Sequence, residues 1–354
     1  MTDRPEPAAL RSTACLDAEP PPVPAGDAVL GVLPLGRHRP RAQRPGLARE
    51  RRPPSGRLPD GVVRRLTDHY GPGIGTWLEG AARLLSDVSD GWNVDLVGFH
   101  DEGWTSVVAA GRTPCGRTVV LKAVPESDRF RRELVALRHW PNGVACRLLD
   151  WDGATQVLLL DAVAGRLGGA ARPVDHQERV ARRLAALHAR RDGGGADLPS
   201  LADYYRDRVM PRIRARAMRF RAEVDAARVS RVLTVAQTLC DSSGPASVLH
   251  ADLYAENALF DEAGEPVFID PYPMVGPPAF DWAFWCVYYR PTAGFADRLD
   301  LCLRHAACPV ADVAAWVATL AVDGALYYLE TGDPTAYSLI DILWHAAVRG
   351  LVEE

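Results

Sequence analysis

The stretch that decides the fold reads His250-Ala-Asp252-Leu-Tyr-Ala-Glu-Asn257, and it is followed by Pro266-Val-Phe-Ile-Asp270-Pro271. Asp252 and Asn257 are five residues apart, so both side chains can face one pocket from a single tight loop. Asp270 comes eighteen residues after Asp252, at the end of a short apolar run. Gly264 lies between the two apolar runs of this segment, which predicts a β-hairpin that delivers Asp270 to the same pocket.

This set of side chains suits phosphoryl transfer from ATP, a reaction that needs few protein groups. One carboxylate receives the proton of the attacking hydroxyl, while an amide and a second carboxylate hold the divalent ions that bridge the phosphates. The ordered series His, Asp, Asn, Asp between apolar runs predicts that chemistry. The alternative is a coincidental loop of turn-forming residues before a buried strand.

Length and composition limit the class of protein. At 354 residues the chain is expected to form two lobes or domains, and its 47% apolar and 24% charged residues are typical of a soluble globular protein. A formal charge of −4 argues against a nucleic-acid partner. The longest apolar stretch, residues 310–329, is interrupted by Asp312 and Asp323, so no membrane span is expected.

The cysteines and the N-terminal sequence predict a cytoplasmic location. The seven cysteines are scattered and form no Cys-x-x-Cys pair, which favours reduced thiols over disulfides or a zinc site. The first residues are polar and rich in proline, without the apolar core of a secretory signal.

Three regions follow from the pattern along the chain. Residues 1–57 are dense in Pro and Arg and are expected to be a disordered extension. Residues 58–161 combine two helical patterns with strand patterns and one further helix, which predicts a small mixed β-sheet lobe that binds the nucleotide. Residues 162–354 are mainly helical around the loop and hairpin, so this lobe should carry the acceptor site. The predicted class is α+β.

Lys122 is the one charged residue in the apolar run Thr118–Ala123. A buried ammonium needs an anionic partner, and Glu133 in the following helix is favoured for this over Glu126. A Lys–Glu pair behind a nucleotide would hold the ammonium against the α- and β-phosphates. The alternative places Lys122 on the solvent face of an edge strand.

Two further segments are candidates for nucleotide contacts. The turn at residues 98–106 is rich in glycine and could cover the phosphates, although it lacks the Gly-x-Gly-x-x-Gly spacing and is equally consistent with a plain hairpin. Leu160 and Asp161 end the last strand of the first lobe, where backbone groups could hydrogen-bond an adenine edge.

From residue 58 to about 350 the chain resembles the aminoglycoside phosphotransferase family of the protein-kinase-like fold, and within it the streptomycin and hydroxyurea phosphotransferase branch. The motifs that carry the resemblance are His250–Asn257, Ile269-Asp270-Pro271 and Gly276-Pro-Pro-Ala-Phe-Asp281. The resemblance implies a bilobal fold and an ATP- and Mg²⁺-dependent transfer to a hydroxyl. It also implies roles for the matching residues: Asp252 as base, Asn257 and Asp270 as magnesium ligands, and His250 and Asp281 as supports of the loop.

The chain departs from the branch at four positions of these motifs. Ala251 replaces a glycine, Tyr254 a histidine, Tyr272 a lysine and Pro277 an aspartate. None of the four changes removes the base or a metal ligand. The departures bear on the substrate, and they keep an inactive member of the fold among the alternatives.

The expected acceptor is a small molecule with a hydroxyl group, bound by a monomer. Acidic residues of the C-terminal helices favour a cationic antibiotic such as streptomycin; the candidates are Asp281, Asp323 and Glu330, with Asp333 and Asp341 beside them. The alternatives are hydroxyurea, a metabolite acceptor of choline or homoserine type, and a nucleotide-binding pseudokinase. The arginines of residues 212–221 are expected to form a solvated helix face.

Overall fold

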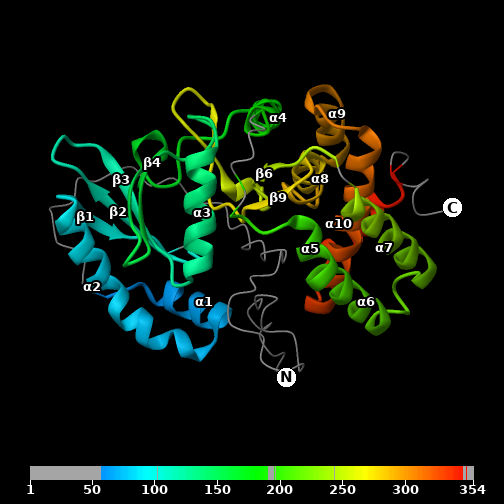
Figure 1. The fold of residues 1–354 in the computed structure, drawn as a ribbon, viewed down its shortest axis with the longest axis horizontal. Helices are drawn as coiled ribbons and strands as arrows, with labels where there is room; N and C mark the ends of the chain where they lie inside the picture. Colours follow the sequence, from blue (N-terminus) through cyan, green and yellow to red (C-terminus); the bar gives the residue numbers. More distant parts are fainter. Residues whose placement is uncertain are drawn as a thin grey trace, which may run out of the picture.

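The structure is a computed structural model that describes residues 57–101, 103–189, 195, 197–242, 244–345 and 348. The extension expected over residues 1–57 lies outside this part of the chain except for Arg57. The described residues form two lobes, a sheet lobe and a helical lobe, with short hairpins between them (Figure 1). The two-lobed α+β architecture predicted from the sequence is therefore present.

The first lobe is built on a five-stranded sheet. Its strands are β1 Asp95–Phe99, β2 Val107–Arg112, β3 Thr118–Ala123, β4 Leu148–Asp152 and β5 Val157–Asp161. They lie in the order β1-β2-β3-β5-β4, and every neighbouring pair is antiparallel. The expected mixed sheet is thus wrong in this detail, because the connection from β3 through α3 to β4 leaves room for β5, which pairs antiparallel with both strands.

Helices cover both faces of this sheet. α1 (Asp60–Tyr70) and α2 (Gly75–Gly91) share one buried cluster with Val119 and Leu121 of β3. α3 (Ser127–His139) packs through Phe130 against Leu158 and Leu160 of β5. Successive side chains of a strand point to opposite faces, so Lys122, one position after Leu121, points toward α3. Its cross-strand neighbour Leu158 belongs to the α3 cluster, in agreement with this direction.

The second lobe is mainly helical. Its helices are α4 His176–Leu187, α5 Leu201–Tyr204, α6 Met210–Arg219, α7 Ala226–Asp241, α8 Pro278–Tyr288, α9 Phe295–His305, α10 Val310–Thr331 and α11 Thr335–Ile342. A π-helical turn, Tyr205–Val209, joins α5 to α6, so the helix from Leu201 to Arg219 is continuous but not regular. The lobe surrounds one large apolar core.

Short strands between the lobes carry the loops of interest. β6 (Ser247–Leu249) pairs with β9 (Met274–Gly276), and β7 (Ala258–Phe260) pairs with β8 (Pro266–Phe268). The predicted hairpin with Gly264 in its turn is therefore present, and Gly264 has a φ of 77°, which favours glycine. Asp252 and Asp270 follow β6 and β8, so both come from the same central set of strands.

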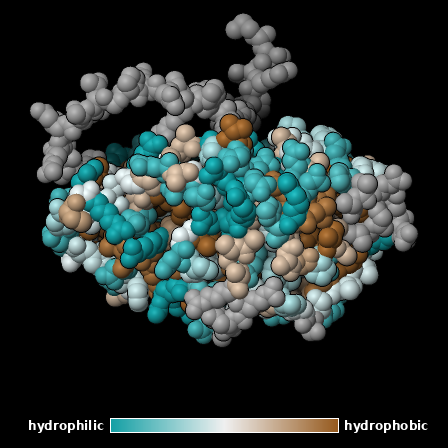
Figure 2. All heavy atoms as spheres, turned by 90° about the horizontal axis from the view of Figure 1, so that it is seen from above, coloured by the Kyte–Doolittle hydropathy of each residue, from teal (hydrophilic) through white to brown (hydrophobic). Residues whose placement is uncertain are grey.

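α10 is long and apolar enough to cross a membrane, but most of it is buried inside the protein. It packs against α7, α8 and α11, which identifies it as the central helix of the second lobe. On the face seen in Figure 2, hydrophilic residues predominate and apolar residues show in separate patches.

Candidate active site

Lys122 connects the two lobes through ion pairs. Its Nζ lies 2.7 Å from both carboxylate oxygens of Glu133 and 2.7 Å from Oδ1 of Asp270. The Lys122 and Glu133 side chains are 2% and 1% exposed, whereas Asp270 is half-exposed at 49%. Burial would lower the pKa of Lys122, but the carboxylates of Asp270 and Glu133 outweigh it and raise that pKa, so the ammonium stays charged.

Of the alternatives for Lys122, the solvent-facing one is excluded by this burial, and its partner is Glu133 as expected. Glu133 lies on α3, which faces the sheet surface to which Lys122 points. The sequence supplied both the lone charge in an apolar strand and the acid in the next helix.

Asp252 and Asn257 meet across the loop that follows β6. A short 3₁₀ turn, Ala255–Asn257, brings Asn257 back, and its Nδ2 donates to the Asp252 backbone oxygen at 2.7 Å and to Oδ2 at 3.2 Å. Asp252 is buried, and this burial raises its pKa to about 7. A carboxyl group that titrates near neutral pH is suited to accept a proton from a substrate hydroxyl.

Asp281 holds the backbone of this loop from the first turn of α8. Its carboxylate accepts hydrogen bonds from the His250 and Ala251 amides, each at 2.8 Å, and His188 Nε2 lies 2.9 Å from it. The side chain is fully buried. The Asp281 carboxylate therefore binds the loop and His188 and is not exposed to an acceptor in this structure. The contact with His188 is one that the sequence did not indicate, since no spacing singles that histidine out.

His250 ties the loop to the segment of Asp270. Its Nε2 lies 3.0 Å from the Ile269 carbonyl oxygen, and its ring stacks on Trp140 with centroids 5.9 Å apart. Burial lowers the pKa of His250 to about 4, so the imidazole is neutral at neutral pH and acts as a hydrogen-bonding support. The Tyr272 amide donates back to the His250 carbonyl at 2.9 Å, which closes the link between the two segments.

Asn257 and Asp270 lie next to each other because the Ile269 amide donates to the Asn257 carbonyl at 3.0 Å. Asp270 has a φ of 51°, in the left-handed region that non-glycine residues seldom occupy. Burial would raise the pKa of Asp270, but the Lys122 ammonium lowers it, so the carboxylate is ionised. The same strained backbone is found at Ala251, with a φ of 56° at the position where the branch has glycine.

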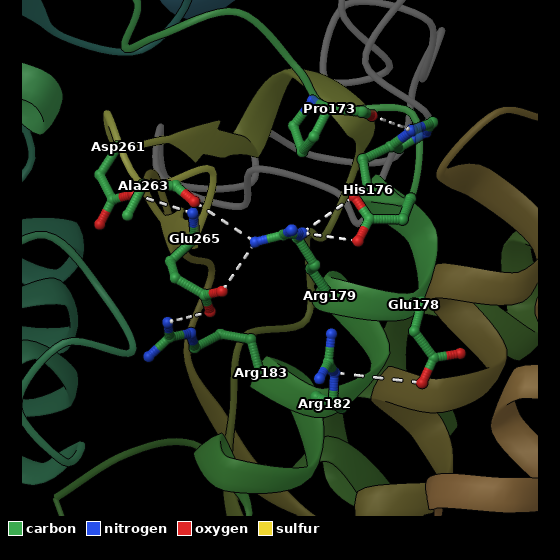
Figure 3. Close-up of polar contacts among 10 residues, drawn as sticks. Pro173, His176, Glu178, Arg179, Arg182, Arg183, Asp261, Ala263 and Glu265 are labelled. Carbon is green, nitrogen blue, oxygen red and sulfur yellow. Dashed lines mark hydrogen bonds and ion pairs between the residues drawn. The ribbon is translucent and has the colours of Figure 1, made fainter.

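The hairpin that delivers Asp270 is fixed to α4 by ion pairs (Figure 3). Arg179 Nη1 and Arg183 Nη2 each lie 3.0 Å from one oxygen of Glu265, which is in the turn between β7 and β8. The Glu265 amide donates to Asp261 Oδ1 at 2.8 Å and tightens the turn. These contacts limit the freedom of the hairpin relative to the helical lobe.

Leu160 and Asp161 lie at the end of β5, where the sheet lobe meets the next segment. Asp161 uses its side chain to pair with Arg117, whose Nε lies 2.7 Å from Oδ1, and its amide donates to the Arg147 carbonyl at 2.9 Å. Leu160 is buried among the residues that α3 covers. A contact of either residue with adenine stays a prediction.

The acidic candidates on α10 have arginine partners. Asp323 is paired with Arg212, whose Nη2 lies 2.6 Å from Oδ2, and Arg216 Nε lies 2.9 Å from Glu330 Oε2. Arg219 Nη1 lies 2.9 Å from the second Glu330 oxygen. The Arg212 and Arg216 side chains are only 10% and 7% exposed, so the expectation that this arginine stretch is a solvated face is wrong for both. α6 turns them inward toward α10, which the sequence pattern did not reveal.

A lysine of a small antiparallel sheet, held by a helix glutamate and paired with an aspartate of the helical lobe, defines the phosphotransferases of the protein-kinase-like fold. Residues 92–306 match the sequence profile of the family described as aminoglycoside/hydroxyurea antibiotic resistance kinase. The chain belongs to this family, so it is a nucleotide-dependent small-molecule kinase. The match covers both motifs and ends before α10.

Individual relatives agree with the family. The chain is 28% identical over 272 residues to a hydroxyurea phosphotransferase of Kitasatospora aureofaciens, covering 75% of this chain and 78% of the relative. It is 27% identical over 231 residues to a streptomycin 6-kinase of Streptomyces griseus, covering 63% and 72% of the two chains.

The solved structure of a protein from Thermobifida fusca, provisionally named a fructosamine-3-kinase, is similar to this chain, with a TM-score of 0.53 and 19% sequence identity. It covers 75% of this chain and 98% of that chain. This likeness confirms the predicted kinase-like fold.

Proposed function

We propose that this chain transfers the γ-phosphate of ATP to a hydroxyl group of an aminocyclitol antibiotic of the streptomycin type. The observation that carries the proposal is the ion-pair series Glu133–Lys122–Asp270 beside the Asp252–Asn257 pair. An inert scaffold has no chemical reason to keep a buried, charged lysine and a buried carboxylate at the junction of its lobes, since both are costly to bury.

In the proposed mechanism Asp252 accepts the proton of the acceptor hydroxyl as its oxygen attacks the γ-phosphorus. Burial keeps the pKa of Asp252 at about 7, close to the pH at which the transfer must run. Lys122 compensates charge on the α- and β-phosphates, and Glu133 fixes the direction of its ammonium. His250 and Asp281 hold the loop in place, which matters because misplacement by ~1 Å can cost ~100-fold in rate.

The residues beside Asp252 fit a magnesium ion. The side-chain nitrogen of Asn257, Nδ2, donates to Asp252, which leaves the side-chain oxygen Oδ1 for a cation. About half of the Asp270 side chain is accessible. No cluster of three or more His, Cys, Asp or Glu is found among the described residues. The side-chain oxygens of Asn257 and Asp270 suit magnesium, which takes one or two protein oxygens and completes its shell with phosphates and water. When bound, the ion neutralises charge that develops on the phosphates.

Hydroxyurea is a second candidate acceptor, and the pairing of Asp323 and Glu330 with arginines favours it. A polycationic antibiotic calls for uncompensated carboxylates, whereas both of these are neutralised by the protein. The relatives named for hydroxyurea and for streptomycin are similar to this chain to nearly the same degree. The C-terminal helices that would select the acceptor lie beyond the matched residues.

The test is phosphate transfer from Mg-ATP to a panel of acceptors, followed by the mass of the product. Transfer to streptomycin with a KM that rises steeply with salt supports the antibiotic, because charge attraction is screened over ~8–10 Å at physiological ionic strength. Preferential, salt-insensitive transfer to hydroxyurea supports the second candidate. Transfer only to choline or homoserine, or Mg-ATP binding without any transfer, contradicts both.

A further inference from the structure

Arg129 is a buried cation at the junction of the lobes, and the proposed mechanism assigns it no role. It lies on α3 one turn before Glu133, so its side chain leaves the helix on the same side as the partner of Lys122. Its side chain is 8% exposed, and its guanidinium carbon lies 5.6 Å from the ring centroid of Tyr272. Tyr272 is two residues after Asp270 and is hydrogen-bonded through its amide to His250.

The guanidinium of Arg129 lacks a hydrogen-bonded anion. Its Nε is buried without a partner, and among the residues that the structure describes no ion pair or hydrogen bond holds the group. A buried arginine remains charged, and burying such a charge without a paired anion costs several kcal/mol. Glu133 and Asp252 act on the Arg129 charge from a distance, but the guanidinium keeps hydrogen-bond donors that an anion from outside the chain can use.

Asp252 identifies where that anion would lie. After burial, Arg129 is the strongest influence on the pKa of Asp252, ahead of Asp270 and Lys122, although no ion pair joins the two side chains. The charge of the guanidinium therefore acts on the base, and Tyr272, which lies under the guanidinium, is hydrogen-bonded to His250 of the same loop. A group placed between the guanidinium and Asp252 would face the proton acceptor on one side and N–H donors of the guanidinium fork on the other.

We propose that Arg129 is a catalytic residue that binds the phosphoryl group during its transfer, an inference that rests on the proposed function. The acceptor oxygen forms its bond to the γ-phosphorus as the bond to the leaving ADP oxygen breaks. The hydroxyl proton passes to Asp252, and Arg129 keeps all its protons while it donates hydrogen bonds to the non-bridging phosphoryl oxygens. Arginine suits this task because its planar fork matches the geometry of phosphate oxygens.

The experiment compares Arg129→Gln and Arg129→Lys with the wild type in turnover and in calorimetric titrations with Mg-ATP, Mg-ADP, and Mg-ADP with aluminium fluoride. Arg129→Gln is expected to lower kcat by about 100-fold or more, as removal of a preorganised donor does. Affinity for ATP and for the fluoride complex should fall, whereas affinity for ADP, which lacks the transferred group, should stay near the wild-type value. Arg129→Lys keeps a charge without the fork and should be intermediate.

Arg132→Gln is the matched control, because Arg132 lies on the same helix with its guanidinium carbon 6.0 Å from the same Tyr272 ring. It should retain kcat within about threefold of wild type, as expected for a cation that does not bear on the chemistry. Equal losses in the Arg129 and Arg132 variants, or equal losses of ATP and ADP affinity in Arg129→Gln, overturn the inference. If the wild type transfers phosphate to no acceptor, the proposed function fails, while the ATP-to-ADP affinity ratio still decides whether Arg129 meets the terminal phosphate.

Discussion

At the scale of single residues, Asp252 is the proposed base, and the burial of its carboxyl group also lowers the stability of the fold at neutral pH. Burial raises the pKa of its carboxyl to about 7, so it is protonated, and unable to accept a proton, in slightly acidic solution. We expect kcat/KM to rise with pH through the region around 7 and to level off above it. A pH profile that is flat from about 5.5 to 8.5 would exclude a base with this pKa.

The same shift has a consequence for stability. The folded protein binds the Asp252 proton more tightly than the unfolded chain, so the free energy of unfolding falls as pH rises from about 4 to about 7. Asp252→Asn removes the buried charge, and we expect it to raise stability above pH 7 by on the order of 2 kcal/mol. At pH below 4 the variant and the wild type should unfold alike. Chemical denaturation at the two pH values measures this difference.

Asp323 is expected to affect stability more than acceptor binding. Its carboxylate pairs with Arg212, whose side chain is only 10% exposed, so Asp323→Asn would leave an uncompensated charge and cost about 3–5 kcal/mol. Asp341→Asn on the exposed face of α11 is the control and should change stability by less than about 0.5 kcal/mol. A stable Asp323→Asn variant with a raised acceptor KM would instead place the carboxylate in the acceptor site.

At the scale of elements, α10 is packed so closely at Gly324 that alanine there should destabilise the protein, although alanine usually stabilises a helix relative to glycine. A Cβ at Gly324 would lie 2.6 Å from Leu339 Cδ1 and 2.6 Å from Tyr288 Oη, and that hydroxyl donates to the Leu320 carbonyl. Gly324→Ala should therefore destabilise the protein by about 1–3 kcal/mol.

Gly80 in α2 is the matched control, since a Cβ there meets nothing within 4 Å. Alanine at this exposed position should stabilise by up to about 1 kcal/mol. Thermal unfolding of the two variants separates packing from helix propensity. Equal stabilisation by both would mean that α8 and α11 do not press on α10 as described.

The sequence predicted the elements well where the signal was local. Lys122 alone in an apolar strand and Gly264 between two apolar runs were sufficient to predict the Glu133 pair and the hairpin. Other features depend on how distant segments pack: the antiparallel order of the sheet, the inward direction of the Arg212 side chain, and the Arg129 guanidinium without a hydrogen-bonded anion. A residue's charge and spacing do not determine which face of a helix becomes buried, so these features required the structure.

At the scale of the whole molecule, polar contacts join the two lobes, among them the hydrogen bond from the Cys146 amide to the Phe268 carbonyl at 2.9 Å. Lys122 of the sheet lobe reaches Asp270 of the central hairpin, and the hairpin is fixed to α4 through Glu265. A nucleotide complex bound across this junction should stabilise the folded state by RT ln(1 + [L]/Kd), which is about 2.7 kcal/mol at a hundredfold excess over Kd. Mg-ATP should therefore raise the Tm, and Asp270→Ala should abolish most of this increase. A full shift in Asp270→Ala would remove Asp270 from the nucleotide site.

The most direct test of the central claim is the phosphate transfer rate of Asp252→Asn, measured together with its Mg-ATP affinity. If Asp252 is the base of a small-molecule kinase, turnover falls by about 100-fold or more while nucleotide affinity stays close to the wild-type value. An Asp252→Asn variant that transfers phosphate at the wild-type rate would contradict the account.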